Sequence, residues 1–193
     1  MSSDIILAGV GGQGVLSIAG IITAAARREG LYVKQAEVHG MAQRGGSVQA
    51  TIRTSSVPIA SELVPMGRAC LVLGLEPLEA LRFAPFLAGD GVVITAAEVF
   101  ENISDYPPIA EVHDAVRRAG GHLVEADRLA RDAGSPRSSN VVMVGAASPW
   151  LPAADDTIEA CIREAFAAKG ERVVEANVRA FRLGRDALTP ASG

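Results

Sequence analysis

A glycine-rich turn near the amino terminus is the first segment of the sequence that could carry chemistry. It reads GVGGQG over residues 9–14 and follows the apolar run IILA at residues 5–8. The spacing satisfies G-x-G-x-x-G, in which glycines let a backbone turn sharply and approach a pyrophosphate at a helix amino terminus. The pattern allows a dinucleotide site, a site for another phosphate- or carboxylate-bearing ligand, or a purely structural turn.

A second segment, EVHGMAQRGG at residues 37–46, concentrates a carboxylate, an imidazole, an amide and a guanidinium among glycines. We call it the polar segment. Loops at the carboxyl ends of parallel strands are where α/β proteins bind ligands. Arg44 is its best anion partner, because a guanidinium can grip a carboxylate or phosphate with two donors. The segment contains no serine or cysteine nucleophile, so it is not expected to catalyse a reaction alone. The alternative is an ordered loop whose polar side chains form hydrogen bonds with the loop's own backbone.

The triplet GDG at residues 89–91 is similar to the start of a thiamine-diphosphate metal motif, which continues with an asparagine farther along the chain. The window around residues 115–121 contains no asparagine, while Asn102 comes too early and Asn140 too late. We therefore interpret the triplet as the turn before a strand at residues 92–94. The chain is not expected to hold thiamine diphosphate by itself.

Metal ligands are also missing from the sequence pattern. The two cysteines, Cys70 and Cys161, lie far apart and form no C-x-x-C pair, which speaks against a zinc site or a chain-borne iron–sulfur cluster. His113 and His122 have no partner at metal-ligand spacing. We expect no metal bound by this chain.

The composition bounds the class of protein. The chain has 193 residues, of which 49% are hydrophobic and 21% charged, as suits one domain over residues 1–193 with a tail at about 189–193 that frays. The net charge is −4 and no run of lysine or arginine occurs, so nucleic-acid and membrane-surface partners have no electrostatic support. No signal peptide is recognised and the apolar stretch at 15–26 is too short to span a bilayer, so we expect a cytoplasmic protein.

Regular elements must position the glycine turn. A strand over 4–9, a helix over 13–29 and a strand over 31–36 predict a βαβ unit and a parallel sheet. An alternating strand at 47–53 then follows where a dinucleotide-binding fold would place a helix, and this departure argues against the dinucleotide interpretation. The polar residues from 38 to 46 are expected to form a loop.

The remaining elements complete an α/β pattern. Core strands are expected at 69–74, 91–95 and 121–125, and helices at 77–83, 109–119, 155–168 and 171–188. Together these elements predict a single α/β domain with a Rossmann-like, mostly parallel sheet flanked by helices and with a helical carboxyl-terminal third.

Four segments in this order resemble a known family. They are GVGGQGVLSIAGII at 9–22, EVHGMAQRGGSVQATIR at 37–53, LEPLEALRFAPFL at 75–87 and NVVMVGAAS at 140–148. The chain is similar over nearly its whole length to the gamma domain of the 2-oxoacid:acceptor oxidoreductases. Within that family it is most similar to the small-subunit branch of the indolepyruvate:ferredoxin oxidoreductases.

The resemblance implies a role as half of an enzyme. The complete enzyme is expected to convert an arylpyruvate, coenzyme A and oxidised ferredoxin to aryl-acetyl-CoA, carbon dioxide and reduced ferredoxin. Thiamine diphosphate, magnesium and iron–sulfur clusters are expected on a larger alpha subunit, so this chain alone is expected to be inactive.

Three alternatives stay open at this point. The substrate could be another 2-oxoacid, such as phenylglyoxylate or a branched-chain acid. The chain could instead be an NAD(P)-dependent oxidoreductase that uses the glycine turn and Glu37, which stands where a ribose-binding carboxylate could lie. It could also be a non-catalytic assembly protein.

The candidate site combines the two glycine-rich segments. We expect them to share one edge of the sheet and to face the substrate, coenzyme A or the partner subunit. The candidate residues are Gly9, Gly11, Gly12, Gln13, Gly14, Glu37, His39, Gln43, Arg44, Gly45 and Gly46.

Overall fold

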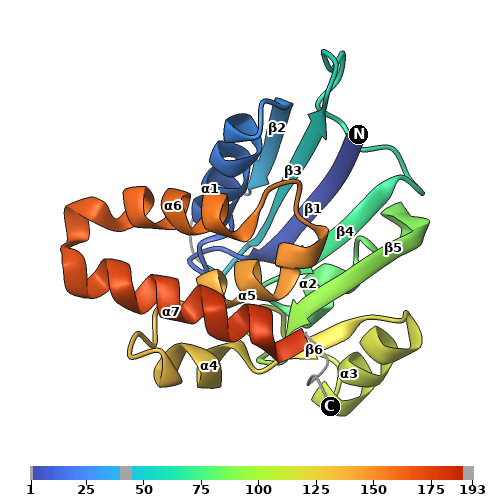
Figure 1. The fold of residues 1–193 in the computed structure, drawn as a ribbon. Coiled ribbons are helices and arrows are strands. Elements are labelled where there is room, and N and C mark those ends of the chain that lie inside the picture. Colours follow the sequence, from blue (N-terminus) through green and yellow to red (C-terminus); the bar gives the residue numbers. More distant parts are fainter. Residues whose placement is uncertain (1, 40–44, 189–193) are drawn as a thin grey trace, which may run out of the picture.

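A six-stranded sheet in the order β2-β3-β1-β4-β5-β6 forms the centre of the computed structural model, which describes residues 2–39 and 45–188. Its strands fan across the molecule in Figure 1. They are β1 (Ser2–Val10), β2 (Tyr32–His39), β3 (Ser47–Ser55), β4 (Ala69–Gly74), β5 (Leu87–Ala96) and β6 (His122–Val124). The sheet continues through the centre of one α/β domain, as the sequence predicts.

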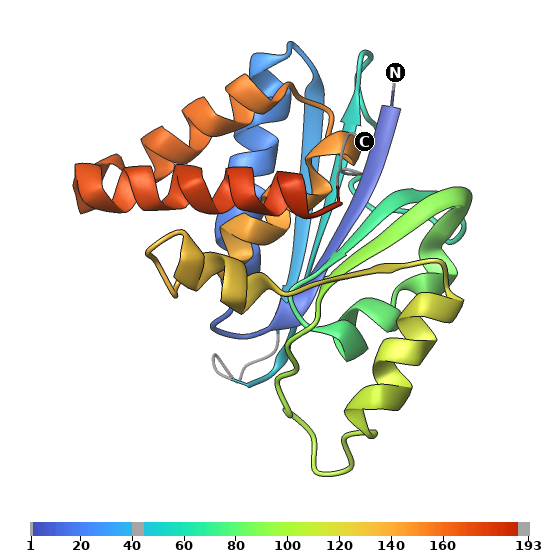
Figure 2. The same cartoon turned by 60° about the horizontal axis from the view of Figure 1, so that its bottom comes forward.

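Helices cover both faces of this sheet. The larger layer consists of α1 (Val15–Arg28), α4 (Ala126–Asp132), α5 (Ser139–Ala147), α6 (Asp155–Phe166) and α7 (Glu171–Leu188). On the opposite face lie α2 (Pro77–Leu81) and α3 (Ile109–Arg118), as Figure 2 shows. No helix in the part of the chain that the structure describes is long and apolar enough to cross a membrane.

The apolar run that precedes the glycine turn is buried on both sides because β1 is central. Ile5 and Leu7 point into the larger core beneath α1 and α5, while Ile6 joins the smaller core on the α2 side. A strand that is covered on both faces shows a continuous apolar run in place of an alternating one. This central strand carries the glycine turn at its carboxyl end.

Strand β3 changes the expected topology. It lies between β1 and β2 and pairs antiparallel with both, while β1, β4, β5 and β6 pair parallel with one another. The prediction of a mostly parallel sheet is confirmed. The two strands of the expected βαβ unit run in the same direction but are separated by one strand, because the chain returns as a hairpin into the gap between them.

Two local predictions are wrong. Residues 38 and 39 extend β2 instead of beginning a loop, since they pair with Gln49 and Val48 of β3. The triplet at 89–91 lies inside β5 instead of before it, at a register shift against β4. A Cβ on Gly91 would lie 2.5 Å from the carbonyl oxygen of Ala69, so this glycine permits a bulge where two backbones approach closely. The expected fraying at 189–193 lies outside the described residues.

Helix α5 is the centre of the helical layer. Every residue from Val141 to Ala147 is buried, and α7 crosses it at backbone contact. A Cβ on Gly145 would lie 1.9 Å from the carbonyl oxygen of Phe181, and a Cβ on Gly184 would lie 1.9 Å from that of Val142. Glycines at both positions therefore let the two helices touch. The sequence predicts a helical carboxyl-terminal third but gives no separate bounds for α4 or α5.

Candidate functional site

The glycine turn joins β1 to α1 with a backbone that only glycine adopts readily. Gly12 and Gly14 have φ of +104° and +90°, in the left-handed region that L side chains avoid. A Cβ on Gly14 would lie 2.4 Å from Nδ2 of Asn140, and one on Gly9 would lie 2.9 Å from Oε1 of Gln13. The turn itself thus accounts for these glycines without a ligand.

Gln13 closes the turn with its side chain. Its Oε1 accepts a hydrogen bond from the N–H of Val10 at 2.7 Å, and its Nε2 donates to the carbonyl oxygen of Leu75 at 3.0 Å. The N–H of Leu75 in turn donates to the carbonyl oxygen of Ala8 at 2.8 Å. The amide of Gln13 therefore binds the turn to the end of β4 across the point where the connections from β1 and β4 go to opposite faces of the sheet. That point is where α/β proteins commonly bind ligands.

The structure brings the glycine turn and the end of the polar segment together. The N–H of Gly11 donates to the carbonyl oxygen of Gly46 at 2.8 Å, and the N–H of Gly45 donates to that of Gly11 at 3.4 Å. An amide that a pyrophosphate would need is therefore already hydrogen bonded. Gln43 and Arg44 lie outside the described residues, as does the side chain of His39.

Glu37 does not join this group. Its carboxylate is exposed on β2 and accepts a hydrogen bond from Nε2 of Gln35 at 2.6 Å. Strand β3 separates β2 from β1 (Figure 1). In dinucleotide-binding folds the ribose-binding carboxylate follows the strand beside β1, so the inserted strand removes the geometric basis for that role.

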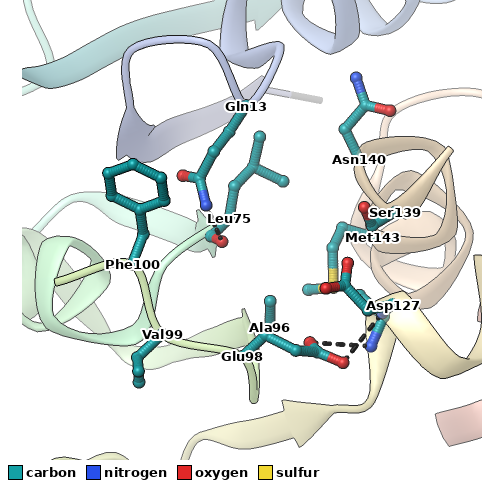
Figure 3. A pocket seen from close by; sticks show the side chains of 11 residues that line it. Gln13, Leu75, Ala96, Glu98, Val99, Phe100, Asp127, Ser139, Asn140 and Met143 are labelled. Carbon is teal, nitrogen blue, oxygen red and sulfur yellow. Dashed lines mark hydrogen bonds between the residues drawn. The ribbon is translucent and has the colours of Figure 1, made fainter. Parts of the chain in front are cut away.

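A pocket that the sequence analysis missed opens beside the turn. Its volume is about 210 Å³, below the roughly 300–1,000 Å³ typical of small-molecule sites. Figure 3 shows side chains from the turn, from the ends of β4 and β5 and from the starts of α4 and α5 around this space. They are Gln13, Leu75, Ala96, Glu98, Val99, Phe100, Ala126, Asp127, Ser139, Asn140 and Met143.

Glu98 in this pocket serves the protein's own backbone. Its two carboxylate oxygens accept hydrogen bonds from the N–H groups of Ala126 and Asp127 at 3.1 and 2.9 Å (Figure 3). The carboxylate therefore caps α4, whose first N–H groups have no partner inside the helix. Among the described residues that line the pocket there is no lysine or arginine, so their charged groups do not favour a phosphate.

Two buried carboxylates lie on the other face of the sheet, at the start of α2. Glu76 and Glu79 are each 0% exposed, and they are the only charged residues among those described that are buried. Glu76 accepts hydrogen bonds from the N–H of Glu79 at 2.8 Å and from the hydroxyl of Tyr106. Burial raises the pKa of Glu76, although both hydrogen bonds oppose the change. The pKa of Tyr106 is raised chiefly by burial and secondly by the hydrogen bond to Glu76.

Glu79 gathers donors from three parts of the chain. It accepts hydrogen bonds from Oγ of Ser47 at 2.6 Å and from Nδ2 of Asn102 at 3.2 Å, and Nε of Arg82 lies 3.3 Å away. Because Ser47 directly follows Gly46, this cluster adjoins the end of the polar segment. In the sequence, the segment LEPLEAL stands out only by its resemblance to the family. Proline at the first position of α2 and glutamate at its third are a helix-start signal that could have marked Glu76 as the cap.

Possible metal ligands are dispersed. In residues 2–39 and 45–188, no group of three or more histidine, cysteine, aspartate or glutamate side chains could hold a metal ion. Nε2 of His113 is hydrogen bonded to the carbonyl oxygen of Ala97 at 2.8 Å. Sγ of Cys70 lies 3.0 Å from Oγ of Ser3, while Cys161 is buried on α6.

Comparisons with known proteins point to one family. The family model described as pyruvate ferredoxin/flavodoxin oxidoreductase matches residues 4–187. The chain is 38% identical over 194 residues to the indolepyruvate oxidoreductase subunit IorB of Archaeoglobus fulgidus, covering 95% of this chain and 94% of that protein. It is also 38% identical over 192 residues to the subunit of the same name from Thermococcus kodakarensis, covering 94% and 93%.

Solved structures share the fold. One is 2-oxoglutarate:ferredoxin oxidoreductase from Magnetococcus marinus, with a TM-score of 0.73 and 24% identity over 98% of this chain and 32% of that one. Another is the keto/oxoacid ferredoxin oxidoreductase gamma subunit from Geobacter sulfurreducens, with a TM-score of 0.69 and 23% identity. The match covers 97% of this chain and 96% of that one. The inserted β3 and the helical layer thus belong to an architecture already seen in solved proteins.

Proposed function

Because the chain belongs to the pyruvate ferredoxin/flavodoxin oxidoreductase family, we propose that it is the small subunit of an indolepyruvate:ferredoxin oxidoreductase. The observation that carries this proposal is 38% identity to indolepyruvate oxidoreductase subunits over nearly the whole of both chains. The complex oxidatively decarboxylates an arylpyruvate with coenzyme A. Its products are aryl-acetyl-CoA, carbon dioxide and reduced ferredoxin.

We place thiamine diphosphate, magnesium and the iron–sulfur clusters on a larger alpha subunit. The residues of this chain do not fit a cluster, because iron–sulfur clusters are held by sets of cysteine thiolates. Cys70 contacts Ser3 while Cys161 is buried in the helical layer on α6. This chain therefore supplies binding and orientation in the complex, which we place in the cytoplasm with coenzyme A and ferredoxin.

The edge of the sheet formed by the glycine turn and the polar segment is the surface we assign to the ligand or the partner. Its support is the pair of hydrogen bonds that join Gly11 to Gly45 and Gly46, which bring both candidate segments to one place. Within that edge Gln13 holds the turn, since its amide is hydrogen bonded to backbone on both sides. Arg44 remains the sequence-predicted anion partner.

Isolation of the complex tests this function. The tagged chain is purified without oxygen from its native host, and the accompanying proteins are identified by mass spectrometry. We expect a larger subunit with thiamine diphosphate and iron–sulfur clusters, and a sample that reduces ferredoxin when an arylpyruvate and coenzyme A are added. A stable chain that emerges alone, or a complex that oxidises only other 2-oxoacids, would contradict the proposal.

A further inference from the structure

We propose that Glu79 is a positioning residue that holds the end of the polar segment against the glycine turn. Glu79 acts through Ser47. This indirect action explains why Glu79 itself lies outside the pocket and outside the candidate site. The inference rests on the proposed function in one respect, because it takes the polar segment to face a ligand or the partner subunit.

The contacts of Glu79 tie three separate segments to one point. Ser47 begins β3, Asn102 lies between β5 and α3, and Arg82 follows α2. The carboxylate is buried, whereas the side chain of Arg82 is 51% exposed. The hydroxyl of Ser47 makes the shortest of the three contacts, at 2.6 Å. Glu79 therefore fixes where β3 begins relative to α2.

The position of Ser47 is passed directly to the glycine turn. Gly46, its neighbour, accepts a hydrogen bond from the N–H of Gly11 at 2.8 Å, and Gly45 donates to Gly11 at 3.4 Å. A continuous path of contacts thus runs from Glu79 through Ser47 and Gly46 to the turn. The end of the polar segment cannot shift along the turn without stretching the bond between Ser47 and Glu79.

Energetics favour positioning over stability as the reason for this carboxylate. Removing a charged group from water costs several kcal/mol, and apolar replacement of buried ion pairs is often neutral or stabilising. A buried carboxylate that adds little stability can still hold the groups it binds in a single fixed arrangement. Asn102 fits this reading: its Oδ1 is buried and has no hydrogen-bond partner among the described residues. If the Asn102 amide were turned over, its Oδ1 would face the Glu79 carboxylate, and both groups are acceptors. The carboxylate therefore also sets the orientation of the Asn102 amide.

Amide hydrogen exchange in the full chain tests the positioning directly. Ser47→Ala should raise the exchange rate of the Gly11 N–H by about tenfold or more, since this amide is held by the neighbouring Gly46. Glu79→Gln should raise it less, because it keeps a neutral acceptor for the hydroxyl and charge-assisted bonds are about twice as strong. Ser47→Thr keeps the hydroxyl and should restore the wild-type rate. An unchanged Gly11 rate in both Ser47→Ala and Glu79→Gln would overturn the proposal.

Thr54→Val is the matched control. Thr54 lies at the other end of β3, and its hydroxyl donates to the carbonyl oxygen of Ser3 at 3.4 Å. Thr54→Val should lower the melting temperature about as much as Ser47→Ala but leave the exchange rate of the Gly11 N–H unchanged. An equal effect of both variants on Gly11 would mean that loss of any hydroxyl on β3 loosens the turn, and would also overturn the proposal.

Kinetics of the assembled complex separate a positioning role from a merely structural one. Ser47→Ala should raise the KM for coenzyme A or for the arylpyruvate by about tenfold with little change in kcat, and Ser47→Thr should reverse the rise. Faster Gly11 exchange with an unchanged KM would make Glu79 structural only and would overturn the positioning role. Failure of the proposed function looks different, because the wild-type complex would then lack arylpyruvate-dependent ferredoxin reduction.

Discussion

Gln13 and Glu98 both direct their side-chain polar atoms to backbone groups at the carboxyl edge of the sheet. Gln13 joins the glycine turn to Leu75, and Glu98 caps α4 at Ala126 and Asp127. A ligand that displaced these bonds would leave backbone groups without partners, at a cost of about 1–3 kcal/mol where those groups are buried. With these bonds intact, both residues shape the surroundings of the candidate site.

Glu76 makes stability depend on pH in a distinctive direction. Burial raises its pKa above the ordinary value of 4.5, so the folded state holds the proton more tightly than the unfolded state. The free energy of unfolding must then fall as pH rises from the ordinary value through the raised one. We expect Glu76→Gln, which cannot ionise, to gain stability relative to wild type as pH rises from about 4.5 to about 7. Urea unfolding across this range measures the difference.

Glu29 supplies a control of opposite sign. Hydrogen bonds from Oγ1 of Thr157 and from the N–H of Ala154 lower its pKa. Wild type should therefore gain stability relative to Glu29→Gln as pH rises through 4.5. A constant difference between wild type and Glu76→Gln at every pH would show that burial does not raise the pKa of Glu76.

At the scale of elements, the contact between α5 and α7 sets the helical layer. Gly145→Ala would place a methyl group 1.9 Å from the carbonyl oxygen of Phe181, so the helices must separate. We expect a loss of about 3 kcal/mol or more in unfolding free energy, at or above the upper end for overpacked cores. Denaturant unfolding measures the loss.

Gly20→Ala on α1 is the matched control for that change. Gly20 is exposed, and a Cβ there meets nothing within 4 Å. Alanine at this exposed helix position should therefore add about 0.5–1 kcal/mol to the free energy of unfolding. Similar effects of the two substitutions would show that helix propensity, and not the approach of α7, decides both.

Local sequence patterns predicted most elements but not their neighbours. The strand at 69–74 and the helix at 171–188 were located correctly, because their composition and periodicity are local properties. The bounds of α5 within the predicted helical third could not be given, because its apolar residues surround the whole helix and leave no 3.6-residue period. The insertion of β3 was missed because alternation identifies a strand without identifying the strand beside it.

At the scale of the whole molecule, one edge of the sheet collects the glycine turn, the pocket and the end of the polar segment. The sequence predicted that the two glycine-rich segments meet, since both follow strands at this edge. It could not predict the cluster around Glu79, because Ser47 and Asn102 reach that carboxylate only after the sheet and α2 have assembled. Contacts across long separations in sequence leave no local pattern.

The same edge makes a clear prediction about nicotinamide cofactors. Gly11 is already hydrogen bonded to Gly46, and Glu37 lies across β3 from the turn. We therefore expect no change in melting temperature when the chain is titrated with NAD⁺ or NADP⁺. A bound ligand at one hundred times its dissociation constant would stabilise the fold by about 2.7 kcal/mol. A saturable rise in melting temperature with either cofactor would revive the NAD(P)-dependent alternative.

The burial of α5 also bears on how the protein is made. This helix has no polar face, and α7 covers it only through the close approach at Gly145 and Gly184. A ribosome that has synthesised the sheet and α5 but not yet residue 184 therefore presents the apolar face of α5 that α7 has still to cover. Such surfaces aggregate or recruit chaperones. Translation of the final described helix is thus the step that releases the nascent chain from that hazard.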